Sequence, residues 1–359
     1  MKVAQLHPIF VFEVALGIDL DHIERLLGGA SGRQTFRHRG RETSFLHYRP
    51  APLRVTQEGT PVRLDQWETA PTADLMLYDF GAASVTYLVE LEDDLGVLAA
   101  ASAQARRSEA LRDDARTRIQ GLLGRLEAAV NRPRIADLSE DYAIVGLSEA
   151  PGGGAALAYC EAHAEAIAQI LRPDPAGLSA DEIRNATELR ISFGPSDVTI
   201  VDWDAAFVLD PAPDDVRAVL EFANVQLLEM RWLDLQLDLA IERSYQLLAR
   251  GQGWRALLPS SVSTDVRQVA ELQLEGAVML ERVVNALKVF GEEYLARIYR
   301  LAARRFQLAE LDRTISRKLA TIESIYQKLS DRSAARRLEL LEWVVILLIA
   351  LEIVLELAR

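Results

Sequence analysis

The sequence contains very little cysteine, with Cys160 as the single example among 359 residues. One cysteine excludes an intrachain disulfide framework and supplies no zinc cluster. An excess of positive charge is also absent, because 53 aspartates and glutamates outnumber 40 lysines and arginines and give a net charge of -13. An acidic chain is poorly suited to hold nucleic acid over a broad surface. We therefore expect no nucleic-acid partner and assign no cofactor.

A basic leader is missing from the N-terminal stretch, which carries one lysine, a short apolar run, and then Asp19 and Asp21. A signal peptide needs a basic region and a small-residue cleavage site, and a mitochondrial transit peptide is rich in arginine. We therefore expect no cleaved signal and no transit peptide.

Long apolar runs are scarce as well. The run from Trp343 to Leu351 has nine residues, whereas a membrane span needs about 20. Extension through Glu352 and Glu356 reaches that length with two acids inside. These two glutamates are four residues apart and share one helix face, from which they can turn toward a partner. Glu342 would lie at the entry interface beside Trp343.

The apolar segment, residues 338–359, follows a basic flank of Arg332, Arg336 and Arg337, which would stay on the cytoplasmic side of a membrane. This arrangement predicts a C-terminal transmembrane helix that anchors the protein in the bacterial inner membrane, with lipid as a partner and the remaining chain in the cytoplasm. The alternative is a buried helix in an oligomeric bundle.

Strand and helix patterns alternate in the first 211 residues and predict an α+β head domain. HPIFVFEVAL, LRVTQE and DLMLYDFGAASVTYLVELE have the β-branched and aromatic content of strands, with a bend at Gly81. DLDHIERLLGG has an acidic start and a glycine stop typical of a short helix. A second series from YAIVG to AAFVLD suggests duplicated β-α-β-β units.

Residues 212–337 predict a helical stalk. Asp210 and two prolines open the first long helix, and a second should begin near Ser263. Gly291, Arg305 and Asp312 interrupt a second seam, so a bend is expected there. An apolar residue at every seventh position of the second helix predicts a coiled-coil hairpin that self-associates into a homo-oligomer. The eight positions are Leu280, Leu287, Tyr294, Leu301, Leu308, Ile315, Ile322 and Leu329.

The C-terminal segment LEWVVILLIALEIVLELAR resembles the end of the required-for-meiotic-nuclear-division (RMD) family, also described as domain of unknown function 155. Leu341, Glu342, Trp343, Glu352, Glu356 and Leu357 stand at positions that match its signature. DLMLYDFGAASVTYLVE and EFANVQLLEMRWLD resemble the strand pair and central helix of that family. Ser316 stands where the family has asparagine. The resemblance implies a membrane-associated, non-enzymatic protein with an α+β head and a coiled-coil stalk.

Few motifs carry chemistry. PGGGAA lacks the Gly-Lys-Ser/Thr of a phosphate loop, and Cys160 with His163 supplies only two metal ligands. The Asp202–Asp210 loop offers carboxylates that can bind Mg²⁺, although aspartates at a turn are the commoner case. The loop 31–50 carries a basic cluster that can touch anionic lipid or RNA: Arg33, Arg37, His38, Arg39 and Arg41.

These patterns favour a membrane-associated, non-enzymatic scaffold or adaptor that self-associates through its C-terminal helices and binds another protein. One alternative is a metal- or nucleotide-dependent regulator or enzyme that uses the Asp202–Asp210 loop. A second alternative is a soluble oligomeric helical bundle with a buried C-terminal helix.

Overall fold

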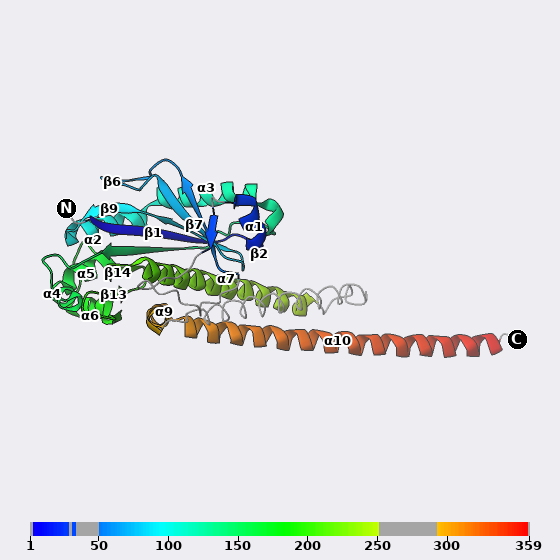
Figure 1. Cartoon of the computed structure of the whole chain (residues 1–359). Helices are drawn as coiled ribbons and strands as arrows, with labels where there is room; N and C mark the ends of the chain where they lie inside the picture. The colour runs from blue at the N-terminus through cyan, green and yellow to red at the C-terminus, as the bar shows by residue number, and fades with distance from the viewer. Residues whose placement is uncertain (1–2, 29–30, 34–49, 251–292, 358–359) are drawn as a thin grey trace. The chain divides into compact units, whose positions relative to one another are not determined.

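The computed structural model describes residues 3–28, 31–33, 50–250 and 293–357. A mixed sheet region comes first and long helices follow, as predicted (Figure 1). The chain divides into two compact units. The first comprises Met1–Trp232 and Arg282–Ala309, and the second comprises Leu233–Glu281 and Glu310–Arg359.

One ten-stranded sheet forms the frame of the first unit. Its strands are β1 (Val3–Glu13), β3 (Ser31–Arg33), β4 (Leu53–Glu58), β7 (Thr72–Leu77), β8 (Ala82–Tyr87), β9 (Val89–Glu92), β11 (Ser139–Leu147), β12 (Arg190–Ile191), β13 (Val198–Val201) and β14 (Ala205–Leu209). The order is β12-β13-β14-β11-β1-β8-β7-β4-β3, and β9 also pairs with β1. Two small ladders join β2 (Gly17–Ile18) to β10 (Val130–Asn131) and β5 (Arg63–Leu64) to β6 (Trp67–Glu68).

The helices of the described chain lie between and after these strands. They are α1 (Leu20–Leu27), α2 (Leu95–Arg107), α3 (Glu109–Arg125), η3 (Glu127–Ala129), α4 (Ala156–Ala162), α5 (Ala164–Leu171), α6 (Ala180–Glu188), α7 (Asp214–Arg250), α9 (Glu293–Arg305) and α10 (Leu308–Leu357). The predicted short helix after β1 is confirmed as α1, with the Asp19 side chain accepting from the His22 amide as its cap.

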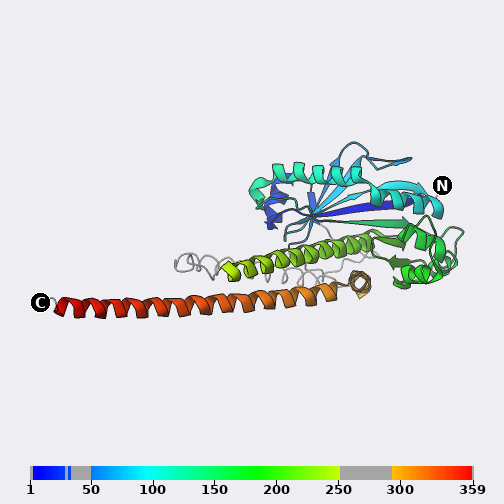
Figure 2. The same cartoon turned by 180° about the vertical axis from the view of Figure 1, so that it is seen from behind.

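The main core of the first unit lies where α2, α3 and α5 cover one face of the sheet (Figure 2). Phe10 and Phe12 of β1 and Val85 of β8 point into this core and are buried. Because successive strand residues point to opposite faces, the intervening residues face the other side, where the Asp214–Trp232 part of α7 packs. The alternation therefore gives the sheet one apolar face and one mixed face.

Strand pairing differs between the two halves of the sheet. The first strand of the first half, β1, is antiparallel to β8, whereas β11, the first strand of the second half, is parallel to β14. Among the described strands, the two suggested β-α-β-β units are therefore not equivalent in their pairing.

A tight turn at Gly81 joins β7 to β8, at the bend predicted from the sequence. Gly81 has φ +110°, a conformation that side chains rarely adopt, and an added Cβ would collide with the carbonyl oxygen of Ala15. Its own carbonyl accepts from the Val14 amide at 2.8 Å. Glycine is therefore required where the turn meets the end of β1.

Helix α9 belongs to the first unit and is fastened to the sheet by polar side chains. Arg305 is only 8% exposed and donates through Nη2 to the Asn185 carbonyl at 2.6 Å. The same nitrogen lies 3.0 Å from Asp202 Oδ1. The Tyr294 hydroxyl donates to Asp197 Oδ2 at 3.0 Å. Arg305, which does not fit a coiled-coil seam, thus has a structural role in docking α9.

The helix breaks between α9 and α10, where Gln307 has φ +52°. This break falls inside the predicted bend region. Tyr294, Leu301 and Leu308 therefore lie in the first unit, whereas Ile315 and Ile322 lie on α10 in the second. Leu280 and Leu287 fall outside the described residues, as does the Leu329 side chain. The predicted coiled-coil hairpin is consequently not confirmed.

In the second unit, Leu233–Arg250 of α7 and α10 run in the same direction (Figures 1 and 2). Lys318 of α10 joins them, with its Nζ 2.6 Å from Asp234 Oδ1 and 2.7 Å from Asp238 Oδ1. Ile315 and Ile322 are fully buried. One ammonium shared by two carboxylates beside a buried apolar stripe fixes the register of the two helices.

We expect Gly81→Ala to lower the free energy of unfolding by at least about 2 kcal/mol, because alanine must adopt a strained φ and displace the Ala15 carbonyl. Urea denaturation followed by circular dichroism measures this change. Gly121→Ala is the control, since this glycine lies within α3 with no atom near its Cβ position, and it should gain about 0.5–1 kcal/mol. Equal effects of the two substitutions would contradict the strain argument.

Candidate functional site

The helical segment Leu341–Leu355 of α10 exposes its apolar side chains in the described structure. Val344 is 50% exposed, Leu347 is 65% exposed and Trp343 is 63% exposed. The other members are similarly exposed: Leu341, Val345, Ile346, Leu348, Ile349, Leu351, Ile353, Val354 and Leu355. Contiguous apolar surface of this kind marks interaction sites for proteins or membranes.

The positions of Glu342, Glu352 and Glu356 divide this helix surface unequally. At 3.6 residues per turn, the three positions fall within a sector about 80° wide. Val345 and Ile349 fall in the same sector, and the rest of the circumference is apolar. The sequence prediction paired only Glu352 with Glu356, whereas the helix places Glu342 on the same stripe. We call Leu341–Leu357 the apolar helix and this sector its acidic stripe.

No helix among the described residues is long and apolar enough to cross a membrane. The predicted transmembrane helix is therefore not supported. The physical reason is the placement of the acids, since Glu342, Glu352 and Glu356 leave an uninterrupted apolar run of only nine residues. The basic flank of Arg332, Arg336 and Arg337 lies on α10, and the structure does not describe these side chains.

The carboxylates of the Asp202–Asp210 loop have separate partners. Asp202 accepts from Arg172 Nη2 at 2.8 Å and also pairs with Arg305. Asp204 pairs with Arg106, and Asp210 Oδ1 accepts from the Ala212 amide at 2.8 Å. Within the described part of the chain, no group of three or more potential metal-ligating side chains is placed to hold a metal ion. The loop aspartates thus take structural positions.

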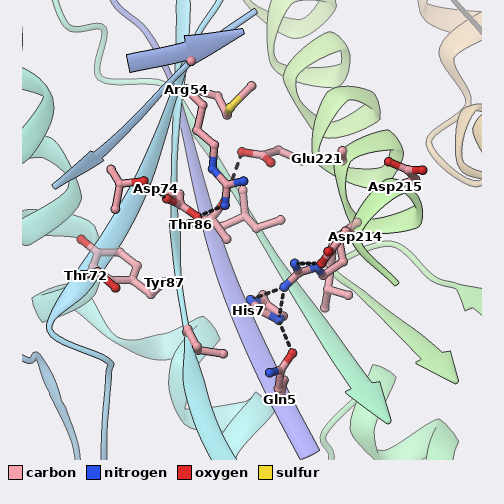
Figure 3. Close-up of a pocket in the computed structure, with 18 of the residues that line it drawn as sticks. Gln5, His7, Arg54, Thr72, Asp74, Thr86, Tyr87, Asp214, Asp215 and Glu221 are labelled. Atoms are coloured by element: carbon pink, nitrogen blue, oxygen red, sulfur yellow. Dashed lines mark hydrogen bonds and ion pairs between the residues drawn. The ribbon is translucent and has the colours of Figure 1, made fainter. Parts of the chain in front are cut away.

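A polar cleft lies on the mixed face of the sheet, against the start of α7 (Figure 3). Its volume is about 950 Å³. Alternate residues of four neighbouring strands supply its floor: Gln5, His7 and Ile9 of β1, Thr86 of β8, Thr72, Asp74 and Met76 of β7, and Arg54 and Thr56 of β4. The start of α7 supplies Asp214, Asp215, Arg217, Ala218 and Glu221 as its wall.

The upper part of the cleft holds Arg54 between two carboxylates. Arg54 donates to Asp74, which also accepts from the Thr56 hydroxyl at 2.6 Å. Burial alone would raise the pKa of Asp74, but the hydrogen bonds from Arg54 and Thr56 outweigh it and lower that pKa. Asp74 therefore remains an anion that orients the Arg54 guanidinium.

Glu221 projects from α7 toward the sheet. Its Oε1 accepts from the Ser84 hydroxyl at 2.6 Å and from the Thr86 hydroxyl at 3.1 Å. Burial raises the pKa of Glu221 above its ordinary value, while these two hydrogen bonds oppose the rise. The result is a carboxyl group held at a fixed point of the cleft, beside the Arg54 guanidinium (Figure 3).

The lower part of the cleft contains an uncharged histidine. Arg217 donates through Nη1 to the His7 ring and through Nη2 to Asp214. Burial, followed by the nearby positive charge of Arg217, lowers the pKa of His7 to about 3. His7 is therefore neutral at physiological pH and accepts a hydrogen bond from the arginine.

A buried pair of acids lies between the end of β1 and α7. Glu13 is 5% exposed, Glu229 is 3% exposed, and their side chains share a hydrogen bond. Burial, followed by the neighbouring Glu229 charge, raises the pKa of Glu13 well above its usual range, although Arg134 acts in the opposite direction. The pair therefore keeps a proton at neutral pH.

Sequence reasoning did not find this cleft. The signal was present in the alternation of LRVTQE, where Arg54 and Thr56 alternate with Leu53 and Val55, and it recurs around Asp74. Polar residues at every second position predict one polar sheet face. Strand order and the place of α7 were not predicted, and both are needed to bring Arg54 and Glu221 together.

Of the basic cluster in the loop 31–50, only Arg33 is described, and it pairs with Asp21 and Glu24.

Comparison with known proteins identifies the sheet region. A family model described as the N-terminal domain of the uncharacterized protein MJ0711 matches residues 4–215. The uncharacterized protein MJ0711 of Methanocaldococcus jannaschii is 24% identical over 195 residues, which cover 54% of this chain and 59% of that protein. The match thus spans less than two thirds of that relative. No solved structure matches the chain. These matches do not support the resemblance to the RMD family.

We expect the stability of the protein to fall as pH rises above the ordinary pKa of a glutamate, because folded Glu13 retains a proton that the unfolded chain releases. One retained proton costs up to about 1.4 kcal/mol of unfolding free energy per pH unit. Glu13→Gln removes this titration, so its stability advantage over the parent should grow from pH 5 to pH 8. Thermal melting at several pH values measures it.

Glu58→Gln, at the exposed end of β4, is the matched control and should follow the parent curve. The stability of the parent should fall relative to that of Glu13→Gln as pH rises from 5 to 8. If this difference stays constant or changes in favour of the parent, the pair does not share a proton.

Proposed function

The chain belongs to the family of the MJ0711 N-terminal domain, and since the description of that family names no activity, we propose a function from the chain's own residues. The protein is a non-enzymatic scaffold that binds a membrane surface through the apolar helix Leu341–Leu357 and self-associates through its C-terminal helices. The observation that supports this proposal is the exposure of the apolar side chains around that helix.

The dimensions of the helix favour the membrane surface over a span. Seventeen helical residues extend about 25 Å, which is less than the roughly 30 Å of a bilayer core. A helix in the plane of the interface can bury a wide apolar face among acyl chains and keep a narrow polar stripe in water. The acidic stripe has this form. The glutamates that oppose a span thus suit a helix that lies on the membrane.

The residues before the apolar helix favour lipid further. Arg332, Arg336 and Arg337 precede it in the sequence, and each cation near an anionic leaflet contributes about 1 kcal/mol to binding. The resemblance of this segment to the RMD family is consistent with membrane association. The head would then remain in the cytoplasm beside the inner membrane.

Two substitutions that add the same charge to neighbouring turns test the proposal. Leu347→Glu places a carboxylate opposite the acidic stripe, where contact with acyl chains costs on the order of 1–3 kcal/mol. We expect about a tenfold loss of binding in flotation of the full chain with anionic phospholipid vesicles. Val345→Glu adds its charge within the acidic stripe and should bind as the parent does.

Equal loss for both variants, or recovery of the parent chain below the vesicles, would reject the membrane-surface proposal. Sedimentation velocity without lipid tests self-association independently of membrane binding. A mass that rises with concentration supports it, whereas a monomer at every concentration contradicts it. A soluble bundle with a buried apolar helix predicts stable oligomers that do not bind vesicles.

A further inference from the structure

The polar cleft has hydrogen-bonding capacity that its described side chains do not use. Arg54 has five N–H donors, and its hydrogen bond to a described residue runs from Nη2 to Asp74. Its side chain is 48% exposed. Glu221 uses Oε1 to accept from Ser84 and Thr86, and Oε2 accepts no hydrogen bond from a described residue. Arg54 and Glu221, which lie near each other in Figure 3, therefore offer guanidinium donors and a carboxyl oxygen that no described residue engages.

The supporting shell holds both groups in position. Asp74, itself oriented by Thr56, fixes one edge of the Arg54 guanidinium and leaves its other donors toward the cleft. Ser84 and Thr86 fix Glu221 from the sheet, although Glu221 belongs to α7. Such fixed partners reduce the ordering cost of binding. The two groups thus form a prearranged pair of opposite charge.

The balance of charges selects the kind of ligand. Among the described lining residues there are four acids, which are Asp74, Asp214, Asp215 and Glu221, and three arginines, which are Arg33, Arg54 and Arg217. This balance of charges among the described residues disfavours a polyanion such as a nucleotide phosphate. The aromatic rings of the lining are Tyr87 and His7, and the Tyr87 hydroxyl already donates to Asp114 at 2.6 Å. Among the described lining residues, a nucleobase or sugar ring therefore finds no open stacking platform.

We propose that the polar cleft binds a free amino acid, with the ligand carboxylate on Arg54 and the ligand ammonium on Glu221. The α-carboxylate and α-ammonium of an amino acid are joined through one carbon, so they can reach two adjacent side chains of opposite charge. Charge-assisted hydrogen bonds of this kind are the strong ones in proteins. The cavity of about 950 Å³ leaves room for the ligand side chain beside Thr72, Thr56 and Met76.

The probes are a mixture of free amino acids, the corresponding amino-acid amides, the N-acetylated amino acids and inorganic phosphate, each added to the full chain. The amides lack the carboxylate, and the acetylated set lacks the ammonium. We expect the free mixture to raise the thermal midpoint and the other three probes to leave it unchanged. Members of the free mixture tested singly by calorimetric titration then identify the preferred side chain.

Arg54→Gln and Glu221→Gln should each weaken binding of the identified amino acid about tenfold or more, because each removes one charged hydrogen bond. Glutamine at position 221 keeps an oxygen for Ser84 and Thr86, and Arg54 is exposed, so both variants should fold. Arg63→Gln, on β5 outside the cleft, is the matched control and should bind as the parent does.

Three results would overturn the proposal. These are no response to the free mixture, equal responses to the amide or acetylated sets, and unchanged affinity in Glu221→Gln. A response to phosphate without one to amino acids would indicate an anion site instead. None of these results affects the membrane proposal, whose flotation test uses residues of the second unit.

Discussion

Side chains alternate between the two faces of a β-strand, and this constraint decides what each face of the central sheet can do. Along β1, the even-numbered Phe10 and Phe12 enter the core beneath α2 and α3. The odd-numbered His7 faces the start of α7 and the cleft. The apolar face gives the sheet its stability, so the opposite face can carry charges and hydroxyl groups that contribute little to the core.

Local signals in the sequence predicted local structure well. Asp19 caps α1, and Gly81 forms the turn whose φ only glycine adopts readily. The seven-residue spacing was less informative, because it continues from Tyr294 to Ile322 across the break at Gln307. Tyr294 is buried against the head, where its hydroxyl contacts Asp197. Residue spacing alone cannot distinguish burial against the head from burial in a coiled-coil seam. Arg305, which does not fit the seam pattern, was the residue that pointed to a different role, and it docks α9 on the head.

The cleft required information that no short segment contains. Arg54 and Glu221 are 167 positions apart in the numbering and meet only because β4 lies two strands from β8 and α7 crosses that part of the sheet. The polar alternation of β4 and β7 was visible, but it is equally typical of a face exposed to water. Only the wall supplied by α7 converts such a face into a cleft with fixed charges.

The cleft and the apolar helix depart from stable packing in opposite directions. The cleft holds charged groups beside a core, where apolar side chains would pack at lower cost. The apolar helix holds leucine and isoleucine in water, where polar side chains would cost less. Proteins keep such departures where function requires them. In the two proposals made above, the cleft takes a polar ligand and the apolar helix takes a membrane surface. The physical chemistry of the two features therefore calls for different partners.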